Sequence, residues 1–188
     1  MRELRSIAGS VVIKIETERL LLRNLALNDI SGDYVDWLNN PEVNKYLSCA
    51  NARQTLESCQ AYVRSYQERN DAALVGIFLK PDQRHIGNLT LSTINWRIKE
   101  TAVGISIGRT GCMGKGFAKE ALNAVVAHCF ECLELNRVSA GIAVDNIGSL
   151  NLFMKCGFGI EKFLPGSSGL GGDISDSYVV SMDKKGQR

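Results

Sequence analysis

Apolar and polar positions alternate with two different periods along this chain of 188 residues. A period of two, or a short apolar run between turn residues, predicts a strand, whereas apolar spacings of three and four predict a helix. The two patterns interleave without an internal repeat or a linker, which predicts one α/β domain. The expected strands are residues 16–25, 73–79, 86–94, 101–108, 138–144, 158–164 and 173–182, and the expected helices are residues 28–38, 56–66, 117–133 and 146–155.

Local signals set several of these boundaries. Asn28 is a residue type that caps helices, so we expect it to begin the first helix. Asn40 and Pro41 are expected to end that helix and begin another, because proline suits the first helical position. Gly157 is expected to end the last helix.

The predicted strand 101–108 has one face made only of small residues. Successive side chains of a strand point to opposite faces. Val103, Ile105 and Ile107 therefore share one face, and Ala102, Gly104, Ser106 and Gly108 share the other. Such a surface accepts either a closely packed helix or a flat ligand. A glycine-rich loop follows directly, which favours the ligand.

Residues 111–122 read Gly-Cys-Met-Gly-Lys-Gly-Phe-Ala-Lys-Glu-Ala-Leu and carry the strongest functional signal. Glycine permits a positive φ and a close approach to the backbone, and a helix beginning here directs free N–H groups at an anion. A Walker loop would need glycine at Arg109 and Ser or Thr at Gly116, and a dinucleotide loop would need glycine at Lys119. Both alternatives fail, so the loop predicts a phosphate cradle of another kind.

The composition of the chain excludes two classes of binding partner. The chain is 45% hydrophobic and 22% charged with a net charge of +2, and it has no basic stripe, so no nucleic acid is expected. No segment approaches the roughly 20 apolar residues of a membrane span, and residues 1–15 lack the pattern of a signal peptide. We therefore expect a cytoplasmic protein with no membrane partner.

Only one pair among the six cysteines has a spacing that is typical of a metal site. Cys129 and Cys132 form a C-x-x-C pair next to His128. Zinc sites of this kind need a second ligand pair at suitable spacing, and the sequence has none. We expect no metal, and buried free thiols instead.

Three segments together resemble the GNAT acetyltransferases. Residues 113–122 resemble the pyrophosphate loop and following helix of that superfamily, residues 146–158 resemble its N-x-x-S and K-x-G-F motif, and residues 16–23 are similar to the first strand of its ribosomal-protein N-terminal branch. The resemblance implies an acetyl-CoA-dependent N-acetyltransferase with a central, mostly antiparallel sheet flanked by helices. It implies a domain at residues 15–183, an extension at 1–14 and a tail at 184–188.

The resemblance also implies how acetyl-CoA, the only expected cofactor, is held. The pyrophosphate is expected on the loop, the pantetheine arm along the strand before it, and further contacts on the second motif, where Asn146 binds the cofactor, caps its helix or does both. The expected cofactor residues are Ile105, Ser106, Ile107, Gly114, Lys115, Gly116, Phe117, Ala118, Asn146, Ser149 and Phe153.

The implied chemistry is direct attack of an amine on the acetyl group in a ternary complex. The family often has a tyrosine at the position of Phe153 to protonate the leaving thiolate, and the nearest remaining hydroxyl is that of Ser149. Ser149 is therefore the expected acid, or else an ordinary helix-turn residue. A family glutamate is replaced by Ala102, which leaves Glu100 or an ordered water as the base.

The acceptor site is expected on the first two helices. Tyr34 and residues 37–46 resemble the W-L-N-x-P-E-V-N-x-Y-L segment of acetyltransferases linked to amino-sugar and surface-polysaccharide synthesis, so Tyr34, Trp37, Asn39 and Tyr46 are expected to bind the acceptor. Trp37 and Tyr46 could instead fill the core. The expected acceptor is a small amine such as an amino-sugar nucleotide. A protein N-terminus or a catalytically inactive CoA-binding module are the alternatives, and the chain is expected to be a monomer or homodimer.

Overall fold

The computed structural model describes residues 10–168 and 174–184, and within them the strands form one eight-stranded sheet. The sheet order is β1-β2-β3-β4-β5-β6-β8-β7, and every neighbouring pair is antiparallel except β5 with β6. The strands are β1 (Lys14–Glu16), β2 (Leu20–Asn24), β3 (Ala73–Leu79), β4 (His85–Asn95), β5 (Glu100–Ile107), β6 (Arg137–Ala143), β7 (Gly159–Ser168) and β8 (Ile174–Asp183). The predicted mixed α/β domain with a mostly antiparallel sheet is thus confirmed.

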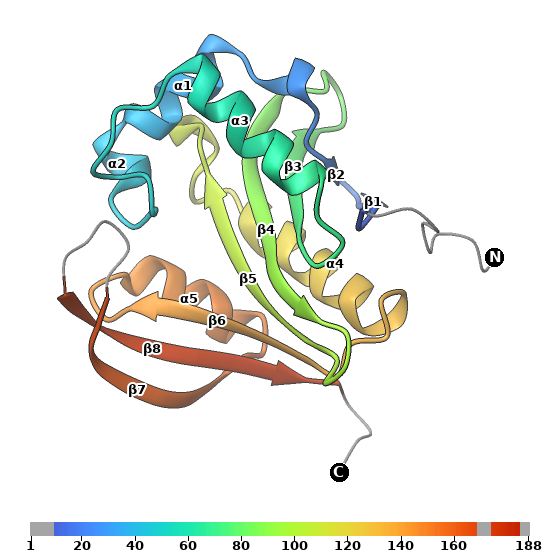
Figure 1. The fold of residues 1–188 in the computed structure, drawn as a ribbon, viewed down its shortest axis with the longest axis vertical. Helices are drawn as coiled ribbons and strands as arrows, with labels where there is room; N and C mark the ends of the chain where they lie inside the picture. The colour runs from blue at the N-terminus through green and yellow to red at the C-terminus, as the bar shows by residue number, and fades with distance from the viewer. Residues whose placement is uncertain (1–9, 169–173, 185–188) are drawn as a thin grey trace.

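Helices cover both faces of this sheet (Figure 1). One face carries the three helices from the first half of the chain, and the other carries the two from the second half, which contact each other. The first group is α1 (Gly32–Asn39), α2 (Pro41–Asn44) and α3 (Leu56–Gln67), and the second is α4 (Phe117–Glu131) and α5 (Ile147–Lys155). Short 3-10 turns lie at Leu27–Asp29 and Thr110–Cys112.

The two faces bury different cores. The core under α4 and α5 is mainly aliphatic and includes Leu89, Leu122 and Val125, which are fully buried. The core under α1 and α3 is smaller and contains Tyr34, Trp37 and Phe78. Aromatic rings with polar tips need hydrogen-bond partners when they are buried, so the second core depends on more specific geometry.

The predicted boundaries at Asn40–Pro41 and Gly157 are confirmed, the cap at Asn28 is wrong, and the predicted strand 16–25 is divided into β1 and β2. Asn40 caps α2 through its side chain and Pro41 begins that helix, while Gly157 follows α5 with a φ of 93°. The first helix is capped by Ser31, whose Oγ accepts from the Tyr34 N–H, and not by Asn28. Asn28 instead lies inside the 3-10 turn at Leu27–Asp29.

The amino-terminal segment is more integrated than predicted. Val11 and Ile13 are buried in the main core, and the Asn24 side chain bonds the Ile13 N–H at 2.6 Å and the Val11 carbonyl at 2.9 Å. Of the predicted extension, residues 10–14 therefore pack as part of the domain. Residues 1–9 of that extension, residues 169–173 and residues 185–188 of the predicted tail lie outside the described residues.

Within the part of the chain that the structure describes, no helix combines the length and the apolar character needed to cross a lipid bilayer.

Candidate active site

The sheet opens between β5 and β6. The two strands pair only at Glu100 with Arg137, Thr101 with Val138 and Ala102 with Ser139. Residues 103–107 remain paired with β4 on their other side, and the two strands diverge from there toward their carboxyl ends (Figure 1). This leaves an opening along five residues of β5, which corresponds to roughly 16 Å of strand.

Backbone groups of β5 face into this opening. Backbone groups of successive residues in a strand point alternately to its two neighbours. The Gly108 N–H bonds the Ile86 carbonyl of β4 at 2.9 Å, so Ser106 also turns its backbone toward β4. The backbone N–H and C=O groups of Ile105 and Ile107 therefore point into the opening. Of the three residues predicted to bind the pantetheine arm, these two offer free main-chain groups and Ser106 offers its side chain.

The glycine loop stands at the wide end of the opening. Gly114 and Gly116 have φ values of 73° and 81°, which confirms that these positions need glycine. Gly116 is the residue before α4 and has no side chain to cap the helix, so the N–H groups of residues 116–119 are free to meet an anion. Phe117 and Ala118 begin the helix, and Lys115 is exposed beside it.

Two residues without a predicted role support this loop. Arg19, in the turn between β1 and β2, donates from Nη1 to the Lys115 carbonyl at 3.1 Å and from Nε to Glu120 Oε2 at 2.6 Å. Its guanidinium also lies over the Phe117 ring, 4.5 Å from the centroid. Arg19 and Glu120 are 101 residues apart in sequence, so no periodicity or spacing signal could have paired them.

The second motif begins α5 beside the same opening. Asn146 caps this helix, and its Oδ1 accepts from the Ser149 N–H at 3.1 Å. Ser149 is half-buried in the first turn. Phe153 is 2% exposed and packs edge-on against Phe158, with ring centroids 4.9 Å apart. In this arrangement Phe153 belongs to the core, which speaks against a direct cofactor contact.

Glu100 lies at the closed end of the opening. It pairs with Arg137 at the point where β5 and β6 are still hydrogen-bonded, two residues before the last pair. A substrate in the open part of the sheet would lie further along β5. That Glu100 acts as the base stays a prediction, and its position at the closed end of the opening does not favour this role.

The sequence predicts only the β5 half of a surface that we call the β4–β5 floor, namely the small face of the predicted strand 101–108. It consists of the paired residues Asn88 with Ser106, Thr90 with Gly104, and Ser92 with Ala102, which share one face. All six are half-exposed although both strands lie inside the sheet. No helix therefore seals this floor, and its side chains are small or polar. The alternation of Asn88, Thr90 and Ser92 with leucines was the available signal.

The small face of β5 has two uses. At Gly108 it receives a helix, because a Cβ there would overlap the Trp37 ring of α1. At Gly104 the nearest atom to an added Cβ is Thr90 Oγ1, which is a neighbour on the floor. The close-packing interpretation therefore holds at one end of the strand, and an open surface lies along the rest.

Two of the residues predicted to bind the acceptor have structural roles. Tyr34 is 1% exposed, stacks on His85 and accepts a hydrogen bond from Asn88 Nδ2 at 3.1 Å. Burial raises its pKa, so the phenol stays protonated. The Asn39 amide bonds the Val35 carbonyl and both backbone groups of Gln54. These contacts speak against substrate binding by Tyr34 and Asn39, because their polar groups are already used.

Tyr46 bridges the two sides of the domain. Its hydroxyl lies 3.1 Å from the Asp145 carbonyl and 3.2 Å from Asp145 Oδ2, at the carboxyl end of β6. Lys45 donates to the same hydroxyl at 2.8 Å, which raises the pKa of its ammonium group. The segment after α2 is thereby tied to the residue that precedes the Asn146 cap.

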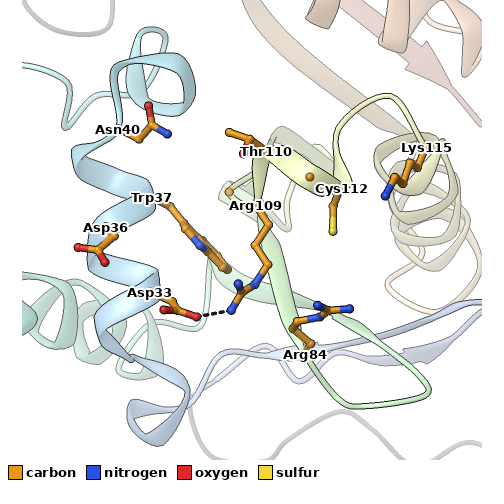
Figure 2. A pocket seen from close by; sticks show the side chains of 11 residues that line it. Asp33, Asp36, Trp37, Asn40, Arg84, Arg109, Thr110, Cys112 and Lys115 are labelled. Carbon is orange, nitrogen blue, oxygen red and sulfur yellow. Dashed lines mark hydrogen bonds and ion pairs between the residues drawn. The ribbon is translucent and has the colours of Figure 1, made fainter.

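Trp37 is 8% exposed and forms part of the wall of a pocket of about 470 Å³ between α1 and the glycine loop (Figure 2). Arg84, Arg109 and Lys115 supply positive charge there, and Asp33 and Asp36 supply negative charge. Arg109 is ion-paired with Asp33. The mixed charge gives the pocket no clear preference for an anion or a cation.

The C-x-x-C pair is divided between the interior and the surface. Cys129 is buried in α4, where burial raises the pKa of its thiol to about 12, whereas Cys132 is exposed. Among residues 10–168 and 174–184, no three His, Cys, Asp or Glu side chains are grouped so as to hold a metal ion. The expectation of buried thiols is confirmed at Cys59 and Cys129 and wrong at Cys132, while Cys49, Cys112 and Cys156 are half-buried.

Comparison with known proteins agrees with this geometry. The family model described as acetyltransferase (GNAT) domain matches residues 19–159. The uncharacterized N-acetyltransferase p20 of Bacillus licheniformis is 29% identical over 175 residues, covering 90% of this chain and 95% of that protein.

Two solved structures share the fold. A GNAT-family acetyltransferase from Bacillus anthracis has a TM-score of 0.79 at 20% identity and covers 91% of this chain and 98% of its own. Spermidine N-acetyltransferase from Vibrio cholerae, solved with CoA and spermine, has a TM-score of 0.78 at 22% identity and covers 89% and 96%. The resemblance in the sequence is confirmed, and the chain belongs to the GNAT acetyltransferase family as an acetyl-CoA-dependent N-acetyltransferase.

Proposed function

We propose that this enzyme acetylates a primary amine on a small molecule, by direct attack of the amine on acetyl-CoA in a ternary complex. The observation that carries the proposal is the β4–β5 floor, a half-exposed polar surface that adjoins the opening between β5 and β6. An acceptor on this floor would lie beside a thioester held in the opening.

The residues present fit acetyl-CoA. The free N–H groups at the start of α4, the positive φ of Gly114 and Gly116 and the charge of Lys115 suit the pyrophosphate. The backbone groups of Ile105 and Ile107 suit the amides of the pantetheine arm. A main-chain N–H in the opening would also stabilise negative charge on the thioester oxygen during attack. When bound, acetyl-CoA supplies the activated acetyl group.

The proton movements involve few protein groups. We assign the Ser149 hydroxyl to relay a proton: it protonates the departing thiolate and takes in return the proton that the attacking nitrogen loses on becoming an amide, because Ser149 lies in the first turn of α5 at the open end of β6 and Phe153 has no proton to give. The amine must lose a proton before attack, since an alkyl amine with a pKa near 10 is mostly protonated at neutral pH. Water on the half-exposed floor is the proposed proton acceptor, in place of Glu100.

Three classes of acceptor are candidates for this floor. The amino-sugar nucleotide predicted from residues 37–46 is one candidate, and the polyamine bound in the Vibrio cholerae enzyme makes polyamines a second. A protein N-terminus is the third. Release of free CoA should be measured with all three classes at equal concentration. Turnover with small amines alone would support the proposal, whereas turnover with peptides alone, or binding of acetyl-CoA without any turnover, would refute it.

A narrower experiment tests the acid. Ser149→Ala should lower kcat while leaving the dissociation constant of CoA unchanged, because the backbone N–H that bonds Asn146 is retained. Ser65→Ala, an exposed serine on α3, is the matched control. Unchanged kcat would remove Ser149 from the mechanism without affecting the assignment of the acceptor.

A further inference from the structure

We propose that Arg19 is a positioning residue for the cofactor loop: it neutralises Glu120 and holds this carboxylate away from the anion site at the start of α4. The inference rests on the proposed placement of the CoA pyrophosphate on that loop. It assigns a function to a residue from the opposite end of the chain, outside the glycine loop itself.

Both carboxylate oxygens of Glu120 accept hydrogen bonds from the turn between β1 and β2. Oε1 accepts from the Thr17 hydroxyl at 2.5 Å and from the Arg19 backbone N–H at 2.9 Å, and Oε2 accepts from Arg19 Nε at 2.6 Å. The Glu120 side chain is only 17% exposed. Its carboxylate is thereby held against the turn between β1 and β2, away from the free N–H groups.

Glu120 poses an electrostatic problem for an anion site. It lies in the first turn of α4, where the helix dipole favours negative charge, and there it would compete with a pyrophosphate for the same positive end. Burial alone would raise the pKa of Glu120, but the bonds from Thr17 and Arg19 lower it, so the group stays charged at neutral pH. A counter-charge is therefore needed for the loop to bind phosphate well.

Arg19 is suited to this role by its shape. One guanidinium reaches Glu120 through Nε and the Lys115 carbonyl through Nη1, two nitrogens held in one rigid plane, whereas lysine has a single nitrogen on a flexible stem. It lies over Phe117, and a Cβ on Gly116 would be 3.5 Å from its Nη2. The same side chain therefore contacts the backbone between the two positive-φ glycines and the carboxylate behind it.

The test measures CoA binding directly by calorimetry, so that it needs no acceptor. Arg19→Ala should weaken CoA binding about tenfold, which is the size expected when one charge-assisted contact is lost and a carboxylate is left unpaired. In a turnover assay the KM for acetyl-CoA should rise by a similar factor with little change in kcat. Arg19→Lys should give an intermediate loss and serves if the alanine variant folds poorly.

A second substitution distinguishes the effect of the unpaired Glu120 charge from the loss of the Arg19 side chain itself. Adding Glu120→Gln to Arg19→Ala removes the unpaired charge but keeps an acceptor for Thr17, and it should restore CoA binding to within about threefold of the wild type. Arg69→Ala is the matched control, because Arg69 forms a similar exposed ion pair with Asp71 on the α3–β3 side of the domain.

Two results would overturn the inference. Unchanged CoA binding in Arg19→Ala would do so, and so would a loss that Glu120→Gln does not relieve although both variants unfold at the same temperature as the wild type. The placement of the cofactor is checked separately with Gly116→Val. If that variant also binds CoA normally, the proposed loop site itself is wrong, whereas a strong loss there with no effect at Arg19 rejects only the present inference.

Discussion

The proposed donor side, around the glycine loop, and the proposed acceptor side, around the β4–β5 floor, are built in different ways. On the donor side, the glycine loop and the free edge of β5 present backbone groups, and their geometry depends on glycines at fixed positions. On the acceptor side, side chains from α1, α2, β4 and β5 meet across long sequence distances, as in the contact of Tyr34 with Asn88.

This difference explains why one side can be recognised from a short motif. A backbone cradle leaves a local mark, because positive φ excludes most residue types. A floor of side chains leaves no such mark, because many residue types are compatible with a half-exposed strand. The predictions below test this contrast, beginning with the largest expected effect.

The donor side should be sensitive to a single β-branched residue in the loop. Gly116→Val forces valine to a φ of 81°, a strain of about 1–3 kcal/mol, so the dissociation constant of CoA should rise about 10- to 100-fold. Calorimetric titration with CoA measures this. Gly111→Val in the same loop is the control, since Gly111 is not among the positive-φ residues and an added Cβ would meet no atom within 4 Å. Equal effects of the two substitutions would show that backbone conformation is not the cause.

The acceptor side should be sensitive to packing. Gly108→Ala places a methyl group inside the Trp37 ring, and the resulting overpacking should lower the free energy of unfolding by about 2 kcal/mol. Urea denaturation measures the change. Gly32→Ala, where an added Cβ meets nothing within 4 Å, should leave the stability nearly unchanged. Normal stability of Gly108→Ala would mean that Trp37 does not rest on this strand.

Both sides should lose stability in mild acid, each through one half-buried histidine. Burial lowers the pKa of His85, on the acceptor side, despite hydrogen bonds at Nε2 to Gly87 and Asn88, and it lowers the pKa of His128 in α4. The folded state therefore binds fewer protons than the unfolded chain. The free energy of unfolding should fall as the pH drops below about 6.5, by at most about 1.4 kcal/mol per pH unit for each histidine.

Chemical denaturation between pH 7.5 and 5 measures this slope. His85→Gln should remove the part due to the acceptor side and leave the part due to His128. If the slope of the variant equals that of the wild type, His85 does not contribute to the acid sensitivity.

The contact of Tyr46 with Asp145, which joins the two sides, should have the smallest effect on binding. Tyr46→Phe removes the hydroxyl that contacts Asp145 and Lys45, so the KM for the acceptor should rise about twofold, the size of a single exposed hydrogen bond. The dissociation constant of CoA should not change. Tyr62→Phe, whose hydroxyl bonds only Tyr66 among the contacts of the described residues, is the control. An effect on CoA binding would show that the two sides are coupled through this bridge.

Some helix caps and side-chain roles follow from neighbouring residues in the sequence, and others depend on distant contacts. Asn40 and Pro41 define the start of α2 because capping acts within one helical turn. Asn28 failed as a cap, because Asp29 bonds the Ala26 N–H and Arg23 and so stabilises a 3-10 turn there instead. Tyr34 and Asn39 were expected to bind substrate because their segment resembles one in other acetyltransferases, but contacts to Asn88 and Gln54 give them structural roles.

The amino-acid sequence by itself determined the family, the alternation of strands and helices, and the position of the glycine-rich loop, because each depends on residues that are close together in the chain. Only the tertiary structure decided where β5 and β6 separate, that β4 supplies half of the floor, and that Arg19 pairs with Glu120 across 101 residues. These features arise from contacts between distant segments. Such contacts form through strand register and packing, which a local pattern of residues does not encode.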